Sequence, residues 1–200
     1  MRVLYLWQGI VSLFLAIVIS FQAFAGEPTE QIKQITDRII SILTDPALKE
    51  PARAEERRKL IRKAADERFD WEEMARRSLA RHWAGRTDEE KREFTSLFSD
   101  LLERAYMDKV EGYSGERVVY EGETVEGDFG VVKVKILTAK ETEISVEYRV
   151  RRKENGWFIY DVSIEGVSLV NNYRTQFNSI ILKSSYRELV KKLEAKLAKK

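Results

Sequence analysis

The residues that could carry out catalytic or metal chemistry are few in this chain of 200 residues, which has one histidine and no cysteine. The lack of cysteine excludes disulfides, thiolate metal sites and cysteine nucleophiles. His82 is the single possible histidine base, and a site with several histidine ligands is excluded. Because His82 follows Arg81 near the expected end of a helix, a packing or capping role is predicted for it.

The other candidates for catalysis lack the sequence context that such chemistry needs. Ser168 stands outside any G-x-S-x-G motif, so no nucleophile elbow is predicted. Asp161 alternates to the side away from the apolar residues of its strand, which predicts a solvated or hydrogen-bonded carboxylate. The glycines near Gly112 and Gly127 match neither phosphate-binding fingerprint. We therefore expect no enzyme activity, no catalytic residue, no metal site and no cofactor.

The charges of the chain are nearly balanced, with 35 Lys and Arg against 33 Asp and Glu and a net charge of +2. This balance argues against a strongly basic nucleic-acid-binding protein. The basic residues within 149–153 alternate with apolar positions, as on a solvated sheet face. Lys183 to Lys200 holds seven basic and two acidic residues. This last segment could be an ordinary surface helix or one that touches an anionic membrane, and the sequence leaves both open.

The first 25 residues have the pattern of a secretory signal peptide. Arg2 is followed by an apolar core, Ile10–Ile19, and by the small residues Ala23 and Ala25 around Phe24. The pattern predicts cleavage after Ala25 and a soluble, periplasmic mature protein. The alternative is an uncleaved membrane anchor, because the charge-free stretch is almost long enough to span a bilayer.

Residues 26–200 are predicted to form one domain. Helices are expected over 28–111, a sheet over 116–165 and further helices over 168–198. Apolar residues recur at helical spacing in the first and last parts, whereas the middle part alternates with a period of two. Such alternation predicts antiparallel strands with one apolar face and one wet face. The fold class is therefore α+β, with a curved antiparallel sheet of four or more strands and helices packed on its apolar face.

Several local signals mark where the elements begin and end. Asp45-Pro46 ends the first helix, Asp70 caps a short one, and Thr87 with Glu90 forms a capping box. Asn155-Gly156 predicts a two-residue hairpin. The strands are expected over 117–121, 130–137, 143–152 and 157–164.

Large apolar side chains of the sheet and the helices are predicted to share one layer. In the fourth strand, Phe158, Tyr160, Val162 and Ile164 are expected to share a face opposite Trp157, Asp161 and Ser163. In the third strand, the residues expected on the apolar face are Ile144, Val146, Tyr148 and Val150. Periodicity alone does not distinguish a filled layer from a hollow one.

Two stretches of the sequence resemble the MlaC family, also called the toluene-tolerance or Ttg2-type family. The first, FDWEEMARRSL, runs from Phe69 to Leu79 and continues with Trp83, Thr87 and Phe94. The second, YDVSIEGVSLVNNYR, runs from Tyr160 to Arg174, where a strand turns into a helix, and continues with Gln176 and Phe177. The resemblance covers the chain from about Glu27 to Leu193.

The resemblance implies a periplasmic carrier that ferries phospholipid between the two membranes of a Gram-negative envelope. It also implies an NTF2-like or MlaC-like twisted sheet whose helices enclose an apolar pocket for acyl tails. The implied partners are an inner-membrane ABC transporter with a ring-forming subunit and an outer-membrane lipoprotein associated with a porin. Nucleic acid is not an expected partner, and a monomer is expected. Phospholipid would be cargo rather than a cofactor.

If the apolar layer is hollow, its large apolar residues are expected to contact the lipid tails. Arg174, near the start of a helix, is the candidate contact for a head group, although capping or surface pairing is the more common role. The expected tail contacts are Tyr106, Val110, Tyr148, Val150, Tyr160, Val162, Ile164, Val167, Leu169, Tyr173 and Phe177.

Two other functions stay open at the level of the residues. One is an enzyme for a small apolar substrate on a similar NTF2-like sheet, which would need a buried titratable group, and the predicted layer offers only tyrosines. The other is an envelope chaperone or adaptor that binds proteins. A carrier would hold phospholipid, whereas an adaptor would hold none.

Overall fold

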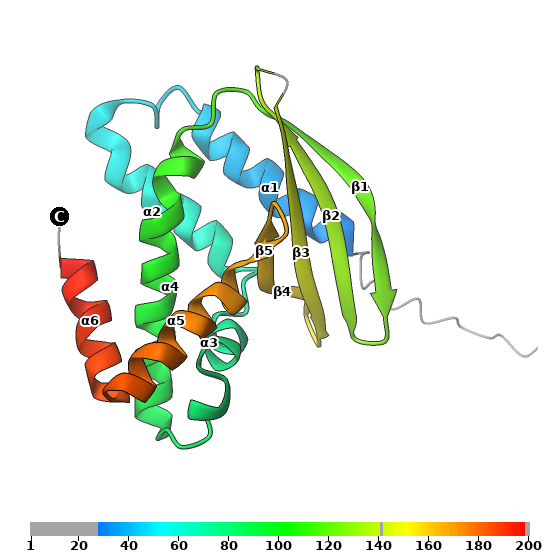
Figure 1. Cartoon of the computed structure of the whole chain (residues 1–200). Helices are drawn as coiled ribbons and strands as arrows, with labels where there is room; N and C mark the ends of the chain where they lie inside the picture. Colours follow the sequence, from blue (N-terminus) through cyan, green and yellow to red (C-terminus); the bar gives the residue numbers. More distant parts are fainter. Residues whose placement is uncertain (1–27, 141, 199–200) are drawn as a thin grey trace, which may run out of the picture.

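The computed structural model describes residues 28–140 and 142–198, so the predicted signal peptide lies outside the described residues. No helix in these two ranges is long and apolar enough to cross a membrane. The elements follow one another as helices, then sheet, then helices (Figure 1). They are α1 (Pro28–Thr44), the 3₁₀ turn η1 (Pro51–Arg53), α2 (Ala54–Asp66), α3 (Trp71–Leu79), the 3₁₀ turn η2 (Ala80–His82), α4 (Asp88–Glu111), β1 (Arg117–Glu126), β2 (Phe129–Leu137), β3 (Glu143–Lys153), β4 (Gly156–Ile164), β5 (Val167–Ser168), α5 (Leu169–Lys183) and α6 (Tyr186–Ala198).

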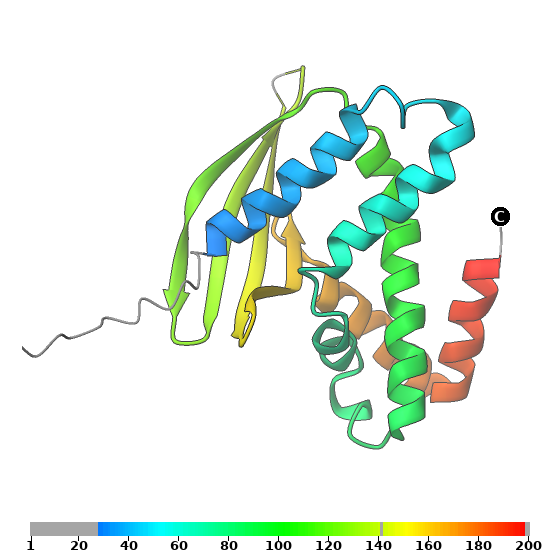
Figure 2. The same ribbon diagram turned by 180° about the vertical axis from the view of Figure 1, so that it is seen from behind.

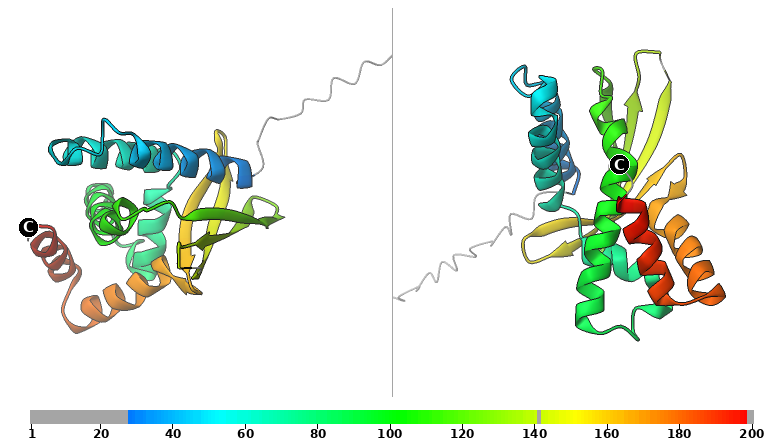
Figure 3. Two further views of the ribbon diagram at one scale, coloured as in Figure 1. Left: turned by 90° about the horizontal axis from the view of Figure 1, so that it is seen from above. Right: turned by 90° about the vertical axis from the view of Figure 1, so that its left-hand side faces the viewer.

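The sheet forms one side of the molecule, and most of the helices form the other side (Figure 1). Figure 2 shows α1 running diagonally across one face of the twisted sheet, which we call the inner face. Ile32 of α1 is buried there. Figure 3 shows α6 beside α4 at the far side of the molecule from β1. The predicted α+β class, with helices on the apolar face of a curved antiparallel sheet, is confirmed.

The sheet has five strands in the order β1-β2-β3-β4-β5, and all neighbouring strands are antiparallel. The two-residue strand β5 was not predicted. Strand β1 continues to Glu126, beyond the predicted end at Glu121, because the pairing with β2 resumes at Gly122 after an irregularity. Gly122 has φ of 129°, which a glycine adopts without strain.

The β3–β4 hairpin turns one residue earlier than predicted. Lys153 pairs with Gly156, so the turn consists of Glu154 and Asn155, and Gly156 is the first residue of β4. Gly156 has φ of 118°. A glycine is needed there because side chains other than hydrogen are strained at this angle.

The predicted helix caps are confirmed. The carboxylate of Asp70 accepts a hydrogen bond from the backbone N–H of Glu73 at 3.3 Å, at the start of α3. At the start of α4, the Thr87 hydroxyl accepts from the backbone N–H of Glu90, and the Glu90 carboxylate accepts from that of Thr87. These bonds satisfy amides that no helical carbonyl can reach.

Helix α2 is joined to α4 by arginines that reach across to carboxylates. Arg57 and Arg58 both pair with Glu111, at 2.6 and 2.7 Å. One helical turn further along α2, Arg62 pairs with Glu103 at 2.6 Å. The contact between these two helices is therefore largely ionic.

The buried apolar residues form two clusters. The first, which we call the helical core, lies among α3, α4, α5 and α6 and is centred on Phe94, Phe98 and Phe177. The second, which we call the sheet layer, joins the inner face of the sheet to α1 and to the start of α5. Its fully buried members are Ile32, Val132, Val134, Val146, Val150, Trp157, Ile159, Val162 and Leu169.

Candidate functional site

The candidate site is the sheet layer, because the strand register brings apolar side chains from four strands together on the inner face. One cross-strand row is formed by Val118, Ile136 and Ile144. A second row, nearer the centre, is formed by Val132, Tyr148 and Val162. Neighbours in such a row have Cβ atoms about 5 Å apart, so the rows form a continuous apolar surface.

The sheet layer is closed at one end and open at the other. Val132, Val150 and Ile159 are fully buried, in the same cluster as Ile32 of α1. At the opposite end, the apolar residues that pack against the layer are only half-buried. These half-buried residues are Val118, Tyr120, Ile136, Ile144 and Ile164, with Tyr106 of α4, whereas the half-buried Tyr148 lies opposite Val132, nearer the centre.

Tyr148 lies in the middle strand of the sheet and packs, half-buried, against the sheet layer. Burial raises the pKa of its hydroxyl to about 12, with a smaller contribution from the neighbouring Tyr120. The side chain nevertheless keeps accessible surface. Burial also raises the pKa of Tyr106 and Tyr173, so these three of the four predicted tyrosines lie in surroundings of low polarity.

The predicted inward orientation of Tyr160 and Phe158 is wrong. Val150 pairs with Ile159 and Arg149 pairs with Asp161, so Tyr160 is an extra residue in β4. This β-bulge reverses the alternation, which places Trp157 and Ile159 on the inner face together with Val162. Tyr160 instead contacts Phe129, which is 48% exposed on the outer face.

The other predicted tail contacts fall into several groups rather than one layer. Val150, Val162 and Leu169 are buried in the sheet layer, with Tyr148 and Ile164 against it. Phe177 belongs to the helical core, where Tyr173 packs against it. Tyr106 contacts both clusters and so links them.

Three predicted residues lie at or near the surface. Val110 is half-buried in the last turn of α4. Val167 is 56% exposed in β5, which separates it from the apolar layer in which it was expected. Arg174 is exposed and donates a hydrogen bond to the side chain of Asn171, one turn earlier in α5. This is the surface pairing that was the more common expectation for Arg174.

Several residues of the site were missed in the sequence. Val118, Tyr120 and Ile136 lie on the inner face at its open end, beside Ile144. Their alternation in the first two strands was the available signal. The sequence did not show that these two strands continue the same apolar surface as the third.

Two hollows in the described part of the molecule lie elsewhere. One of about 560 Å³ lies between α2, α4 and α6 and is lined by charged residues such as Arg58, Asp100 and Glu103. The other, of about 500 Å³, lies between α3 and α4 around Trp71 and Arg92. Neither is lined by a predicted tail contact, and their polar walls are unsuited to hydrocarbon.

The residues that could have done chemistry have structural partners. His82 Nε2 lies 2.9 Å from Oδ1 of Asn178, which ties η2 to α5. Asp161 is buried and accepts hydrogen bonds from the Ser168 hydroxyl at 2.5 Å and the backbone N–H of Val170 at 3.1 Å. Asp161 is thus hydrogen-bonded, as one of the two expectations had it, and it holds the start of α5 against β4. Among the described residues, no group of three or more acidic or histidine side chains could hold a metal ion.

The family model of the MlaC protein matches residues 33–195, a range that includes both motifs and runs from within α1 to within α6. The chain belongs to the MlaC family. A relative in this family is the intermembrane phospholipid transport system binding protein MlaC of Haemophilus influenzae, 21% identical over 121 residues. That alignment covers 58% of this chain and 56% of the relative, so the chain matches only about half the length of this curated MlaC protein.

A solved structure extends the MlaC likeness to the whole fold. It is the phospholipid-binding protein from Ralstonia solanacearum in complex with a phospholipid. The TM-score is 0.76 at 26% sequence identity, and the match covers 85% of this chain and 98% of that protein. The sheet and helices described above are therefore the fold on which that relative binds phospholipid.

Proposed function

We propose that this protein is a periplasmic phospholipid carrier that shields acyl tails in an apolar pocket and moves lipid between the inner and outer membranes. The observation that carries the proposal is the match to nearly the full length of a relative whose structure contains a phospholipid. The half-buried apolar rows at the open end of the sheet layer supply a surface of the right chemistry in this chain.

The physical task of a carrier is to keep hydrocarbon out of water. Exposure costs about 0.8 kcal/mol per methylene, so two ordinary acyl chains would cost on the order of 20 kcal/mol in the periplasm. A wall of valine, isoleucine and tyrosine side chains removes most of this cost without directed polar contacts. The proposal therefore requires no catalytic group, and a phosphate head group could stay in water at the pocket mouth.

We place the tails between the inner face of the sheet and the C-terminal half of α4. Ile144, Ile136 and Val118 would form one wall, and Tyr106 on α4 would face them across the gap. Tyr148 would lie at the bottom, where its half-buried ring packs against the sheet layer. Tyrosine suits this place because its ring is apolar and its hydroxyl can reach water or a lipid ester.

The location and the partners that we propose for the carrier are those that the resemblance to the MlaC family implies. We propose export with cleavage of the signal peptide after Ala25, a monomeric mature protein in the periplasm, and function as the soluble component of an Mla-type ABC transport system. The partners would be the inner-membrane transporter complex and an outer-membrane lipoprotein–porin complex. Phospholipid would be the cargo, with no cofactor.

Lipid analysis of the purified mature protein tests this function. Native mass spectrometry should show near-stoichiometric phospholipid, and solvent extraction should recover intact diacyl lipid rather than hydrolysis products. A protein that carries no phospholipid after purification, and takes up none from vesicles, would contradict the proposal and favour an envelope chaperone or adaptor.

A further inference from the structure

The outer face of the sheet carries a second surface that lipid carriage does not use. It combines aromatic and cationic side chains of the three adjoining strands β2, β3 and β4 with those of α3. We call it the arginine–aromatic surface, and its members are Arg77, Phe129, Arg149, Arg151, Lys153 and Tyr160.

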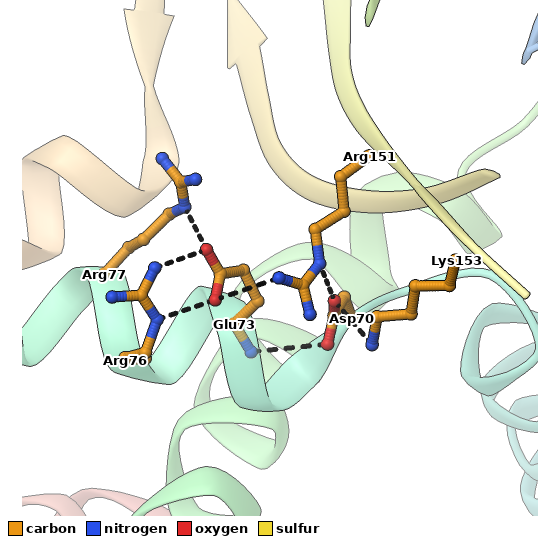
Figure 4. Close-up of polar contacts among 6 residues, drawn as sticks. All are labelled: Asp70, Glu73, Arg76, Arg77, Arg151 and Lys153. Carbon is orange, nitrogen blue, oxygen red and sulfur yellow. Dashed lines mark hydrogen bonds and ion pairs between the residues drawn. The ribbon is translucent and has the colours of Figure 1, made fainter. Parts of the chain in front are cut away.

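Two buried carboxylates form ion pairs with the cations of this surface. Asp70 accepts from Arg151 Nε and Lys153 Nζ, both at 2.7 Å, and Glu73 accepts from Arg77 Nε at 2.7 Å (Figure 4). The side chains of Asp70 and Glu73 are 4 and 5% exposed, whereas those of Arg77, Arg151 and Lys153 are 31 to 37% exposed. The negative charges therefore lie beneath the positive charges, and the positive charges face the solvent.

The cations outnumber the carboxylates. Arg76 also pairs with Glu73, at 2.6 Å, so four cations share two carboxylates. Arg149 is exposed on the same face and forms no ion pair in the described part of the chain. Glu126, opposite Phe129 in the β1–β2 ladder, is an exposed carboxylate at the rim and only partly offsets this excess. Asp161, opposite Arg149 in the β3–β4 ladder, is a further carboxylate of this face, but it is buried like Asp70 and Glu73, so the charges that this surface exposes are mainly positive.

An exposed aromatic pair lies among these cations. Phe129 is 48% exposed, and its ring meets that of Tyr160 edge to face with centroids 6.0 Å apart. The guanidinium of Arg77 lies 4.1 Å from the centroid of the Tyr160 ring. Arginine and aromatic residues are the types enriched at the centres of protein–protein interfaces, where they supply most of the binding energy.

The position of the surface favours a protein over a bilayer as its occupant. Phe129 pairs with Arg151 and Gly130 pairs with Val150, so Phe129 faces away from the sheet layer. A bilayer on this surface would be separated from the lipid pocket by the sheet. A protein can bind here and still reach around to the pocket mouth.

We propose that the arginine–aromatic surface docks an acidic protein partner, whose carboxylates pair with Arg77, Arg149 and Arg151 around Phe129. The inference rests on the proposed function, in which this partner is the membrane-bound transporter that exchanges lipid with the carrier. Docking on the outer face leaves the inner face free for the lipid.

The test compares two double variants of matched chemistry. Phe129→Ser with Arg149→Glu alters the surface, and Leu182→Ser with Lys183→Glu makes the same changes at the exposed end of α5. Each mature protein is loaded with fluorescent phospholipid. Transfer is then measured to proteoliposomes that contain the organism's inner-membrane transporter complex, and to empty phosphatidylglycerol vesicles.

We expect the first variant to keep its phospholipid, as measured by native mass spectrometry, and to transfer it to the proteoliposomes about tenfold more slowly than wild type. The control should stay within about twofold of wild type. Unchanged transfer by the first variant would overturn the docking proposal, and so would an equal loss toward empty vesicles, which would indicate membrane contact. Arg149→Gln alone removes the charge at an exposed position without placing a second carboxylate opposite Asp161, so it keeps the test open if the double variant does not fold. If wild type carries no lipid, the proposed function itself fails.

Discussion

Val150 lies opposite Ile159 in the β3–β4 ladder, whereas the preceding residue, Arg149, lies opposite Asp161. The bulge at Tyr160 absorbs the difference, so Ile159 and Val162 both face inward while Tyr160 faces outward. One additional residue thereby changes which side chains of β4 lie on each face. The inner face contributes to the sheet layer, and the outer face contributes an aromatic ring to the arginine–aromatic surface.

Two tyrosines on opposite faces of the sheet should differ in their effect on lipid. We expect Tyr148→Ala to lower the phospholipid that copurifies with the protein by at least half, because the variant removes a large half-buried ring from the inner face of the sheet. Tyr160→Ala should leave phospholipid occupancy unchanged, because that ring contacts Phe129 and Arg77 outside. Native mass spectrometry of both variants measures this. Equal losses would show that the proposed pocket is misplaced.

Filling the open end of the sheet layer should exclude lipid. Ile144→Trp adds volume at a half-buried inner position, so occupancy should fall severalfold at a cost to the free energy of unfolding of only about 1 kcal/mol. Val119→Trp is the matched control, because Val119 is half-buried in β1 and alternates to the outer face. A wild-type lipid content in Ile144→Trp would mean that this row does not line the pocket.

Glu73 should make the stability of the fold depend on pH in acid. Burial alone would raise its pKa, but hydrogen bonds from Arg76 and Arg77 outweigh burial and lower the pKa from 4.5 to about 2. A carboxylate with a lowered pKa stabilises the folded state above pH 4.5, and this contribution is lost as the pH falls from 4.5 toward 2. We expect it to be about 2 kcal/mol, because the partially exposed arginines weaken the pairing.

Urea unfolding of wild type and Glu73→Gln at pH 6, 4.5 and 3 measures this contribution. The free energies of unfolding should differ most at pH 6 and clearly less at pH 3, which is still about one unit above the pKa of Glu73 in the folded protein. A constant difference across the three values would show that the ionised form of Glu73 contributes nothing.

Gly156 should tolerate no side chain. It has φ of 118°, and an added Cβ would lie 2.6 Å from Oε1 of Gln31, whose side chain accepts from the backbone N–H of Trp157. Gly156→Ala should therefore lower the free energy of unfolding by about 2 kcal/mol. Gly85→Ala is the control, with open space around its Cβ, and should change it by less than about 0.5 kcal/mol. Thermal or urea unfolding measures the stability of both variants. Similar free energies of unfolding would show that a side chain at position 156 causes no strain.

Structural features that depend on residues within one turn of the chain were predictable from the sequence. Features that depend on pairing with a neighbouring strand were not. The caps at Asp70 and Thr87 need only residues three positions away, and both are present as predicted. The bulge at Tyr160 is set by pairing with β3, so alternation alone assigned the first half of β4 to the wrong face.

The candidate site was predictable only in part for a similar reason. Val150, Val162 and Leu169 lie in the sheet layer as expected, whereas Phe177 lies in the helical core because α5 leaves the sheet after its first turn. Alternation identifies which face a residue shares. It does not identify how many strands contribute to a face or whether space remains above it, so the row that includes Val118 and Ile136 was missed.

The strength of the ion pairs that join the arginines of α2 to α4 should depend on the salt concentration. Exposed pairs such as Arg58–Asp108 weaken as the salt concentration rises, because dissolved ions screen charges that are accessible to solvent. The burial of Ile32 against the sheet does not weaken in this way. A rise in ionic strength would then loosen the contact between α2 and α4 while α1 stays packed on the sheet.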